Sequence, residues 1–418
     1  MLSSDKTSTG LFSCGCPNNH LSIQHPGDSL RERAWVEINL EALAGNVHRL
    51  KRLLSEKTEL MAVVKADAYG HGAITVAQTA IAAGASWLGV ATVPEGIQLR
   101  EAGIKAPILI LGATHTPEQI QAIAHWQLQP TLCTPKQALI FSEILQNLEQ
   151  ILPVHIKLDT GMSRLGINWQ YAAEFVQMVN NLPNLNIASI YSHFATADSP
   201  EQTIMWQQYQ RFIEAIADIS ASGNGINSHN NFPKLHLANS AATLTNSTLH
   251  LDLVRVGLAM YGLYPEQHLQ TAVKLEPVLQ VKARITQVKT IEAGAGVSYG
   301  HQFKADREMQ IAVVGIGYAD GVPRNLSNKM QVLIRGQQVK QIGAITMDQL
   351  MLDVSTIPDL EIGEIVTLLG NDGNQQILAD DWAKILGTIS WEILCGFKHR
   401  LPRVAIGHPG KFQLEKVY

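Results

Sequence analysis

Five polar residues at the ends of short apolar runs could form one chemical site. They are Lys65 after MAVV, Arg164 in KLDTGMSRLG, His193 in YSHFATAD, Ser240 in HLANS and Arg255 in LVRVG. A lysine at the end of a buried strand is unusual unless it has a partner or a chemical role, because burying an ammonium is unfavourable. Burial lowers a lysine pKa, and a neutral amine can condense with a carbonyl. The pattern indicates carbonyl chemistry at Lys65; the alternative is a strand that ends in a solvated lysine.

The elements that must position these residues are apolar runs separated by helical patterns. Eight runs follow one another: Met61–Lys65, Trp87–Thr92, Pro107–Leu111, Leu128–Cys133, Leu152–Asp159, Leu185–Phe194, Leu235–Ser240 and Leu253–Gly257. Strands that alternate with helices indicate parallel βα units, and eight of them predict a (β/α)8 TIM-like barrel. The active site of that fold lies at the C-terminal ends of the strands, where the five polar residues fall. A doubly wound open sheet is the alternative, although no glycine-rich dinucleotide fingerprint follows an early strand.

A phosphate site is expected at the same mouth of the barrel. The loops after strands seven and eight often bind phosphate in this fold, and here they contain Ser240, Gly257 and Leu258. Tyr69 could reach the same phosphate. A carbonyl-reactive lysine beside a phosphate cradle suggests pyridoxal phosphate held as a Schiff base. Arg255 could donate to the pyridine nitrogen but not protonate it, because an arginine pKa exceeds about 12. Such an arrangement favours proton removal and return at Cα.

The chain changes character near residue 275. The segment Val278–Ile291 alternates over much of its length, and strand-like runs follow at Gln310–Tyr318, Gln331–Ile334 and Val339–Ile345. Turn signals separate the later runs, which predicts a mainly antiparallel β domain. Tyr299 lies in the glycine-rich segment GAGVSYG, which is not a dinucleotide fingerprint. It is a candidate second base if this turn reaches the barrel mouth, and otherwise an ordinary loop aromatic.

Length and composition limit the class of protein. At 418 residues two domains are expected, preceded by a mobile extension: 1–33 as the extension, 34–272 as the cofactor-binding barrel and 273–418 as the β domain. A net charge of −4 gives no general affinity for nucleic acid or an anionic membrane. No apolar run approaches the roughly 20 residues that span a bilayer, and the N-terminus lacks an export signal.

Cysteine usage indicates the compartment. The four cysteines are Cys14, Cys16, Cys133 and Cys395, and such sparse use suits a reducing environment. Cys14 and Cys16 stand in a polar tail without further ligands, so no metal site is expected. We therefore expect a cytoplasmic protein.

The motifs in both predicted domains closely resemble bacterial alanine racemase. The segments VVKADAYGHG, KLDTGMSRLG, YSHFATAD, HLANSAA, VRVGLAMYG, GVSYGHQF, GYADGVPR and ITMDQLMLDV occur in the family's order, between about Trp35 and Arg403. The resemblance implies a homodimeric, pyridoxal phosphate-dependent enzyme that interconverts L-alanine and D-alanine. Its product would supply peptidoglycan synthesis.

The resemblance also implies roles for catalytic and cofactor-binding residues. Lys65 matches the Schiff-base lysine, which also serves as the base for the D-enantiomer. Tyr299 matches the base for the L-enantiomer, which the other subunit supplies. Arg255 matches the arginine on the pyridine nitrogen, and His193 would link it to Tyr299 by hydrogen bonds. The residues that match the phosphate cradle are Tyr69, Ser240, Gly257 and Leu258.

Further matches concern the substrate. Arg164 resembles an arginine near the ring hydroxyl and the substrate carboxylate, and Lys157 a lysine that is carbamylated in many members and positions that arginine. Met347 matches the residue whose backbone amide binds the substrate carboxylate, with Asp348 beside it. Tyr318 matches a tyrosine that lines the substrate access route.

Two departures from the family pattern and three alternative functions remain. Trp391 stands where many members have a tyrosine that donates to the phosphate, and Thr346 where a cysteine often precedes the Met-Asp pair. A broader-specificity amino-acid racemase is one alternative, although such enzymes are often exported. A decarboxylase of the same fold would place a carboxylate at the position of Arg255. A non-catalytic pyridoxal phosphate carrier would not need the β domain with Tyr299.

Overall fold

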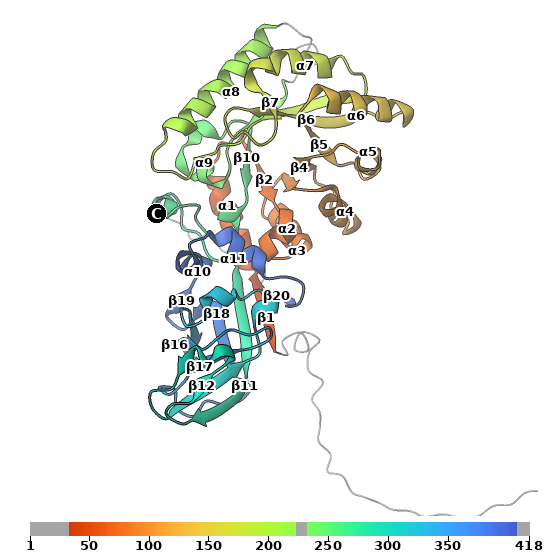
Figure 1. The fold of residues 1–418 in the computed structure, drawn as a ribbon. Helices are drawn as coiled ribbons and strands as arrows, with labels where there is room; N and C mark the ends of the chain where they lie inside the picture. Colours follow the sequence, from red (N-terminus) through yellow and green to blue (C-terminus); the bar gives the residue numbers. More distant parts are fainter. Residues whose placement is uncertain (1–32, 223–231, 408–418) are drawn as a thin grey trace, which may run out of the picture.

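The computed structural model describes residues 33–222 and 232–407. The predicted N-terminal extension, with Cys14 and Cys16, lies outside these ranges except for Arg33. The described chain forms two lobes, a strand-and-helix barrel and a β domain, with the short helices α10 (Ala379–Leu386) and α11 (Ser390–Gly396) between them (Figure 1).

Eight parallel strands form the barrel. In spatial order they are β10 (Leu253–Val256), β2 (Glu59–Val63), β3 (Trp87–Val90), β4 (Ile108–Ala113), β5 (Gln129–Leu132), β6 (Leu152–Asp159), β8 (Leu185–Tyr191) and β9 (Lys234–His236). The ring closes between the first and the last, where the amides of Asp252 and Arg255 donate to the carbonyls of Leu235 and Ala238, each at 3.0 Å. Each of the eight predicted runs overlaps one of these strands, so the barrel prediction is confirmed. The two-residue strand β7 (Ile167–Asn168), which the sequence did not predict, pairs with β6 outside this ring.

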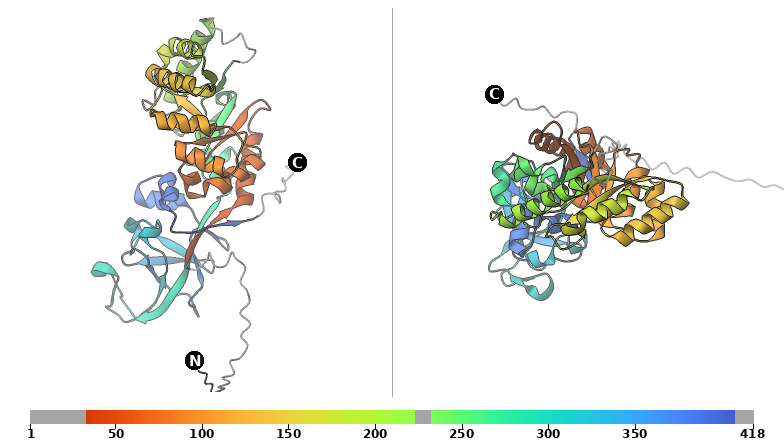
Figure 2. Two further views of the ribbon diagram at one scale, coloured as in Figure 1. Left: turned by 90° about the vertical axis from the view of Figure 1, so that its right-hand side faces the viewer. Right: turned by 90° about the horizontal axis from the view of Figure 1, so that it is seen from above.

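Helices cover the outside of the barrel (Figure 2). They are α1 (Leu40–Arg52), α3 (Ala73–Ala82), α4 (Val93–Glu101), α5 (Pro117–His125), α6 (Pro135–Asn147), α7 (Ala172–Asn180), α8 (Thr203–Ala221) and α9 (Ser240–Thr245). Threonine side chains begin two of them: Thr116 accepts from the amide of Gln119, and Thr134 from that of Gln137. A threonine at this position stabilises a helix start because it pairs an amide that the helix leaves without a partner.

A mainly antiparallel sheet forms the second lobe, as predicted. Its strand order is β19 (Gln375–Ile377), β18 (Ile365–Asp372), β15 (Gln331–Ile334), β16 (Gln337–Ile342), β17 (Leu350–Asp353), β14 (Met309–Val314), β11 (Leu279–Ile291), β1 (Ala34–Asn39) and β20 (Arg403–Ile406). The long strand β11 pairs with β1, β14 and β18, and its register shifts between Ile285 and Gln287. A small hairpin of β12 (Gly296–Val297) and β13 (Phe303–Lys304) projects from this lobe.

Strand β1 differs from the domain boundary expected at residue 34. It pairs antiparallel with β11 and parallel with β20, so it belongs to the C-terminal sheet and the barrel begins with α1. The alternating pattern AWVEIN predicts a strand but does not say which sheet receives it. Both ends of the described chain thus build the second lobe.

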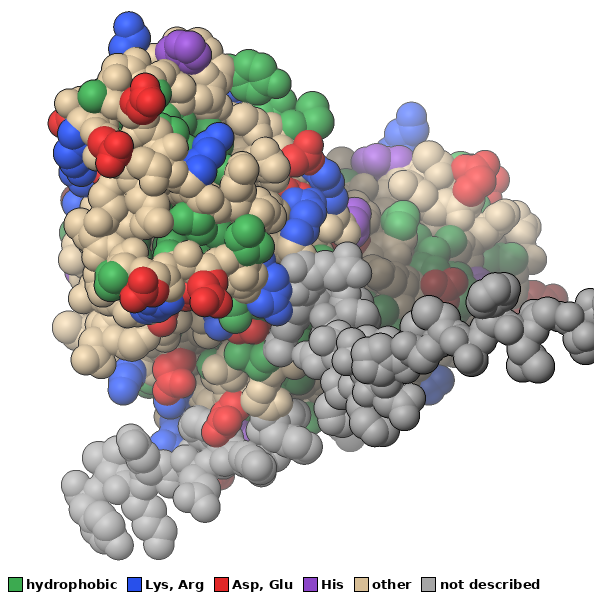
Figure 3. Space-filling model, turned by 90° about the horizontal axis from the view of Figure 1, so that it is seen from below, with side chains coloured by type: hydrophobic (Ala, Val, Ile, Leu, Met, Phe, Trp, Pro, Cys, Tyr) green, Lys and Arg blue, Asp and Glu red, His purple; other side chains and the backbone are tan. Residues whose placement is uncertain are grey.

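The surface and the interior fit a folded two-lobed protein. One cluster of buried apolar side chains extends through the barrel and into the C-terminal sheet. The face of the molecule seen in Figure 3 carries acidic and basic side chains in a mixture, interspersed with small apolar groups. Within residues 33–222 and 232–407, none of the helices has the length and apolar character needed to cross a bilayer.

Candidate active site

Lys65 begins an unusual turn directly after β2. The residues from Ala66 to Tyr69 in α2 (Lys65–Gly70) have φ values from 51° to 56°, which makes the turn left-handed. This conformation costs roughly 1–2 kcal/mol per residue, and such strain concentrates at functional sites. Two contacts hold the turn: the amide of Ala66 donates to Glu95 at 2.8 Å, and that of Ala73 to Asp67 at 2.8 Å.

The glycine after this turn allows α11 to pack closely. Gly70 has φ 81°, and a Cβ built there would lie 2.6 Å from the carbonyl oxygen of Leu394 in α11. Trp391 lies on the same short helix and is partly buried against the core. The lysine turn and the helix that carries this departure from the family pattern therefore pack together.

The environment of Lys65 favours the neutral amine. Its pKa is lowered, first by burial and then by the positive charge of Arg164. The negative charge of Glu95 raises the pKa of Lys65, but this carboxylate also accepts hydrogen bonds from the amides of Ala66 and Ala91. A lowered pKa raises the fraction of lysine that can act as a nucleophile or a base near neutral pH.

Arg255 is buried and held from several sides. It is 4% exposed and donates to the carbonyls of Ser192 and Leu237 at 2.8 and 3.1 Å. It also contacts Nδ1 of His236 at 2.9 Å and Nδ1 of His193 at 3.1 Å. A guanidinium only donates, so both histidines accept through Nδ1 and carry their proton on Nε2. Burial lowers the pKa of Arg255 to about 10, which leaves it charged at neutral pH.

Lys157 is a second buried amine beside this arginine. It is 6% exposed, and its Nζ lies 5.3 Å from the centre of the Tyr191 ring. Burial, followed by the charge of Arg255, lowers the pKa of Lys157 to about 8. His193 has a pKa of about 2 for the same two reasons and is therefore neutral.

The predicted phosphate cradle is assembled at the start of α9. The hydroxyl oxygen of Ser240 accepts from the amides of Gly257 and Ala259 at 3.0 and 3.4 Å. A Cβ at Gly257 would lie 2.5 Å from the hydroxyl oxygen of Tyr69, so only glycine fits there. Leu258 follows in a short 3-10 turn and is buried. Burial raises the pKa of Tyr69, which keeps its hydroxyl protonated and able to donate to an anion.

Arg164 lies on an exposed loop that its neighbours shape. The side chain of Asp159 accepts from the amides of Gly161 and Ser163 at 2.9 and 3.0 Å. Arg211 donates to the carbonyl of Thr160 at 3.0 Å. The effect of Arg164 on the pKa values of Lys65 and Lys157 shows that its charge acts at the barrel mouth.

The remaining predicted residues form a group on the C-terminal lobe. Tyr299, Met347 and Tyr318 are 73%, 53% and 42% exposed. Hydrogen bonds tie their turns together: the amide of Tyr318 donates to Thr346 at 2.9 Å, that of Ala319 to Met347 at 3.0 Å, and the Ser298 hydroxyl to Ala344 at 2.7 Å. Tyr299 lies in the loop between β12 and β13, and this hairpin lies in the lobe away from the barrel (Figure 1). The structure of one chain therefore does not bring Tyr299 to Lys65.

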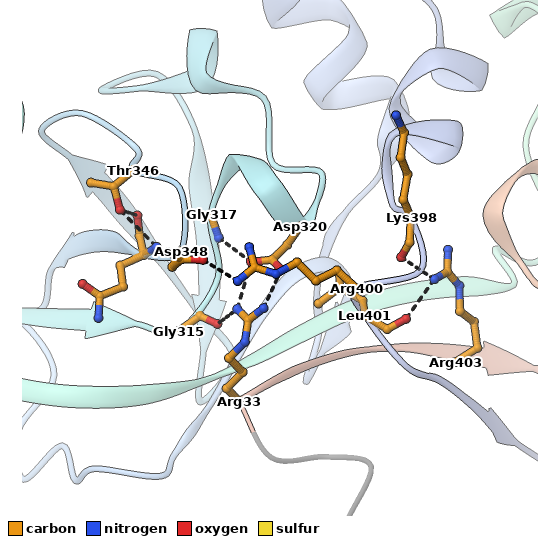
Figure 4. Close-up of polar contacts among 11 residues, drawn as sticks. Arg33, Gly315, Gly317, Asp320, Thr346, Asp348, Lys398, Arg400, Leu401 and Arg403 are labelled. Carbon is orange, nitrogen blue, oxygen red and sulfur yellow. Dashed lines mark hydrogen bonds and ion pairs between the residues drawn. The ribbon is translucent and has the colours of Figure 1, made fainter.

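A buried carboxylate, that of Asp320, lies beside the turn that contains Thr346 and Asp348 (Figure 4). Asp320 is fully buried and accepts from Arg33 at 2.6 and 2.9 Å and from the amide of Gly317 at 2.9 Å. Arg400 lies 3.6 Å from Asp320 and pairs with Asp348 at 2.5 Å. The Thr346 hydroxyl closes the turn by donating to the carbonyl of Gln349 at 2.9 Å. Thr346, the second departure, therefore shapes the turn that presents Met347.

Sequence reasoning missed several residues of these networks. His236, Tyr191, Glu95, Asp320 and Arg400 were not predicted. His236 stands in the quoted segment HLANS, so the strand end could have drawn attention to it. Asp320 and Arg400 act on residues far away in the chain, and local pattern carries no signal of such pairing.

Comparison of this chain with known protein families divides it into the same two domains. Residues 38–265 match the family model of the alanine racemase N-terminal domain, and residues 278–405 that of the alanine racemase C-terminal domain. Alanine racemase of Nostoc sp. is 71% identical over 377 residues, which are 90% of this chain and 96% of that protein. Alanine racemase of Synechocystis sp. is 62% identical and covered in full, again over 90% of this chain.

Solved structures agree. Alanine racemase of Bacillus anthracis with bound L-Ala-P has a TM-score of 0.84 and 35% identity, over 90% of this chain and 96% of that one. The Bartonella henselae enzyme, with covalently bound pyridoxal phosphate, has a TM-score of 0.79 and 29% identity, over 90% of this chain and 100% of that one. The fold is a barrel of eight parallel strands joined to a mainly antiparallel β domain. The chain belongs to the alanine racemase family.

Proposed function

We propose that this protein is an alanine racemase that interconverts L-alanine and D-alanine by exchanging the Cα proton between two bases. The observation that carries the proposal is that Lys65 directly follows β2 and Arg255 lies on the adjacent parallel strand β10, with Gly257 against the Tyr69 hydroxyl and hydrogen-bonded to Ser240. The curated relatives at 71% and 62% identity carry the same name.

The residues present fit pyridoxal phosphate. Ser240, Gly257, Leu258 and Tyr69 would hold its phosphate, since a Cβ at Gly257 would fill the space against the tyrosine hydroxyl. Arg255 would donate to its pyridine nitrogen and Lys65 would bind its carbonyl carbon. When bound, the cofactor withdraws electrons from Cα and so acidifies the proton there.

Arg255 would determine the outcome at Cα. It remains a donor at neutral pH because its pKa stays near 10 even when buried. By donating a hydrogen bond but no proton to the pyridine nitrogen, Arg255 would limit the electron withdrawal that the cofactor supplies, and so would favour return of the Cα proton over side reactions.

Lys65 and Tyr299 would take the proton on opposite faces of the substrate, Lys65 for D-alanine and Tyr299 for L-alanine. Because Tyr299 is 73% exposed on the far lobe, its base function requires a second copy of the chain. It lies on the rim of an open hollow of about 970 Å³ that includes Val297, Ile311, Val313 and Met351. The lining mixes these apolar side chains with polar ones such as Gln287 and Thr346, as protein–protein interfaces commonly do, which supports contact with a second chain beside Tyr299. We therefore propose a homodimer with shared active sites.

The substrate carboxylate would bind at the Met347 amide and at Arg164. Tyr318 and Asp348 would line the approach to it, with Asp348 held by Arg400. The lowered pKa of Lys157 supports its carbamylation, because only the neutral amine adds carbon dioxide. A carbamate there would bear a negative charge opposite Arg164.

The cellular role follows from the product. Sparse cysteines predict a reducing cytoplasm, where D-alanine would supply peptidoglycan synthesis.

The test is to incubate the holoenzyme with L-alanine in D₂O and to follow D-alanine and Cα deuterium together. Deuterated D-alanine is the expected product. Exchange without inversion would contradict two bases, and a bound cofactor without any exchange would contradict the proposal as a whole.

A further inference from the structure

A belt of hydrogen bonds runs around the inside of the barrel behind Arg255. Its members are Gln129 on β5, His155 on β6, Ser189 on β8, His236 on β9 and Arg255 on β10, one residue from each of five neighbouring strands. The successive contacts measure 2.7, 2.6, 2.8 and 2.9 Å. The three middle residues are at most 1% exposed.

All hydrogen bonds of the belt are donated in the same order, from Arg255 towards Gln129, because Arg255 can only donate and the Gln129 oxygen can only accept. Arg255 only donates, so Nδ1 of His236 accepts and its Nε2–H donates to the oxygen of Ser189. The Ser189 hydroxyl then donates to Nδ1 of His155. The Nε2–H of His155 donates to the side-chain oxygen of Gln129, which only accepts.

The opposite tautomer of His155 would break this order. Ser189 would then receive two hydrogen bonds and its own O–H would have no acceptor in the belt, which is costly for a buried hydroxyl. Both imidazoles must also be neutral, because a second proton on His236 would face the Arg255 donor and one on His155 would leave the Ser189 O–H without an acceptor in the belt. Burial lowers the pKa of His155 to about 3 and that of His236 well below its usual value, in agreement.

The aromatic side chains that pack against the two imidazoles have their own polar groups engaged elsewhere. Tyr191 stacks on His236 at 4.6 Å and 4°, and its hydroxyl is engaged with Thr131 at 2.7 Å. The indole of Trp87 meets His155 edge-on at 5.7 Å, and its N–H donates to Glu59. The aromatic rings fix the planes of the imidazoles, and the hydrogen bonds of the belt determine which ring nitrogen carries the proton.

We propose that Gln129, His155 and Ser189 are positioning residues for Arg255, which they hold through one tautomer of His236. With Nδ1 of His236 kept as an acceptor, the guanidinium keeps this anchor and its orientation towards the cofactor ring. This inference rests on the proposed role of Arg255 at the pyridine nitrogen. Without Ser189, His236 could place a proton on Nδ1, where it would face an arginine donor.

The direct test is the ¹⁵N NMR spectrum of histidine-labelled holoenzyme, which distinguishes protonated from unprotonated ring nitrogens. His155 and His236 should both carry their proton on Nε2. Signals from Nδ1–H at either residue in the native enzyme would overturn the belt. This readout does not depend on turnover.

Two variants test the positioning role. Ser189→Ala and, at the partly exposed end of the belt, Gln129→Met should each change the histidine ¹⁵N shifts and the visible absorbance of the bound cofactor. For Ser189→Ala, kcat should fall on the order of tenfold while KM changes little, the scale for a group that orients another group's partner. Ser142→Ala, which removes a buried serine hydroxyl on helix α6, is the matched control and should change none of these.

The possible outcomes separate this inference from the proposed function. Changed ¹⁵N shifts with unchanged absorbance and kcat would make the belt merely structural and refute the positioning role. If Arg255→Lys leaves the cofactor absorbance unchanged, the proposed role of Arg255 fails, although the tautomers could still be as described.

Discussion

The two lobes carry their functional residues in opposite ways. In the barrel, Lys157 and Arg255 are 6% and 4% exposed, and hydrogen bonds to neighbouring strands and loops fix Arg255. On the β domain, Tyr299 and Met347 are 73% and 53% exposed. In the proposed site, one chain supplies the barrel residues, and the exposed β-domain residues would act in the site of a partner chain.

This difference in exposure explains the lowered pKa values of the site residues in the barrel. Burial lowers the pKa values of Lys65, Lys157 and Arg255. On the proposed shared site, the surroundings of Tyr299 would come from the partner chain. Substitutions in the barrel should act on each chain alone, and substitutions at the turns only through the dimer.

The largest effect is expected for Lys65→Ala, which removes both the cofactor attachment and one base. Racemisation should fall by at least about 10⁴-fold in both directions, measured as formation of each enantiomer. Lys136→Ala, which replaces an exposed lysine on α6, is the control. Retention of more than a few per cent of activity would refute the role of Lys65.

Tyr299→Phe should lower racemisation by about 10²–10³-fold, because it removes one acid–base group and leaves the barrel intact. Exchange of the Cα proton of D-alanine with D₂O should persist, since Lys65 serves that enantiomer. The exposed Tyr171, at 58%, provides Tyr171→Phe as a control. Equal loss of Cα proton exchange for L-alanine and D-alanine would contradict the assignment of one base to each enantiomer.

Lys157 should make the stability of the folded chain depend on pH. Its pKa falls from 10.5 to about 8 in the folded chain, so the unfolded chain binds more protons between these values. The free energy of unfolding contributed by this residue should therefore rise with pH across that window, by about 3 kcal/mol at most. Urea unfolding in buffer free of carbon dioxide should show the rise in the native protein relative to Lys157→Met. If the free energy of unfolding changed with pH in the same way for both proteins, the lowered pKa of Lys157 would be excluded.

The smallest effect concerns the support of the Met347 turn. Arg400→Gln removes the ion pair with Asp348, and KM for alanine should rise about threefold with little change in kcat, as expected for an exposed pair. Arg335→Gln is a matched control, because Arg335 is also 43% exposed and pairs with Glu364. A change in kcat larger than that in KM would show that the turn does more than position the substrate.

Much of the barrel could be predicted from the sequence, because buried parallel strands appear as apolar runs and their C-terminal ends share one mouth. Lys65, His193, Ser240 and Arg255 were selected as candidate site residues in this way. The left-handed turn after Lys65 could not be predicted, since it depends on contacts with Glu95 and α11. The sheet that receives β1 also depends on residues more than two hundred positions away.

The predictions for the β domain depended more on family resemblance. A tyrosine among glycines has no chemical meaning alone, and Met347 acts through a backbone amide that any residue could supply. Their roles become visible only when the exposed turns are considered together with a second chain.

The central claim is that each active site takes Lys65 from one chain and Tyr299 from its partner. Mixing Lys65→Ala and Tyr299→Phe chains under conditions of subunit exchange tests it directly. Hybrid dimers would contain one fully native site, so activity should recover to about a quarter of the native value, because half of the dimers are hybrids and one of their two sites works. No recovery, with hybrid dimers demonstrated, would contradict the shared site.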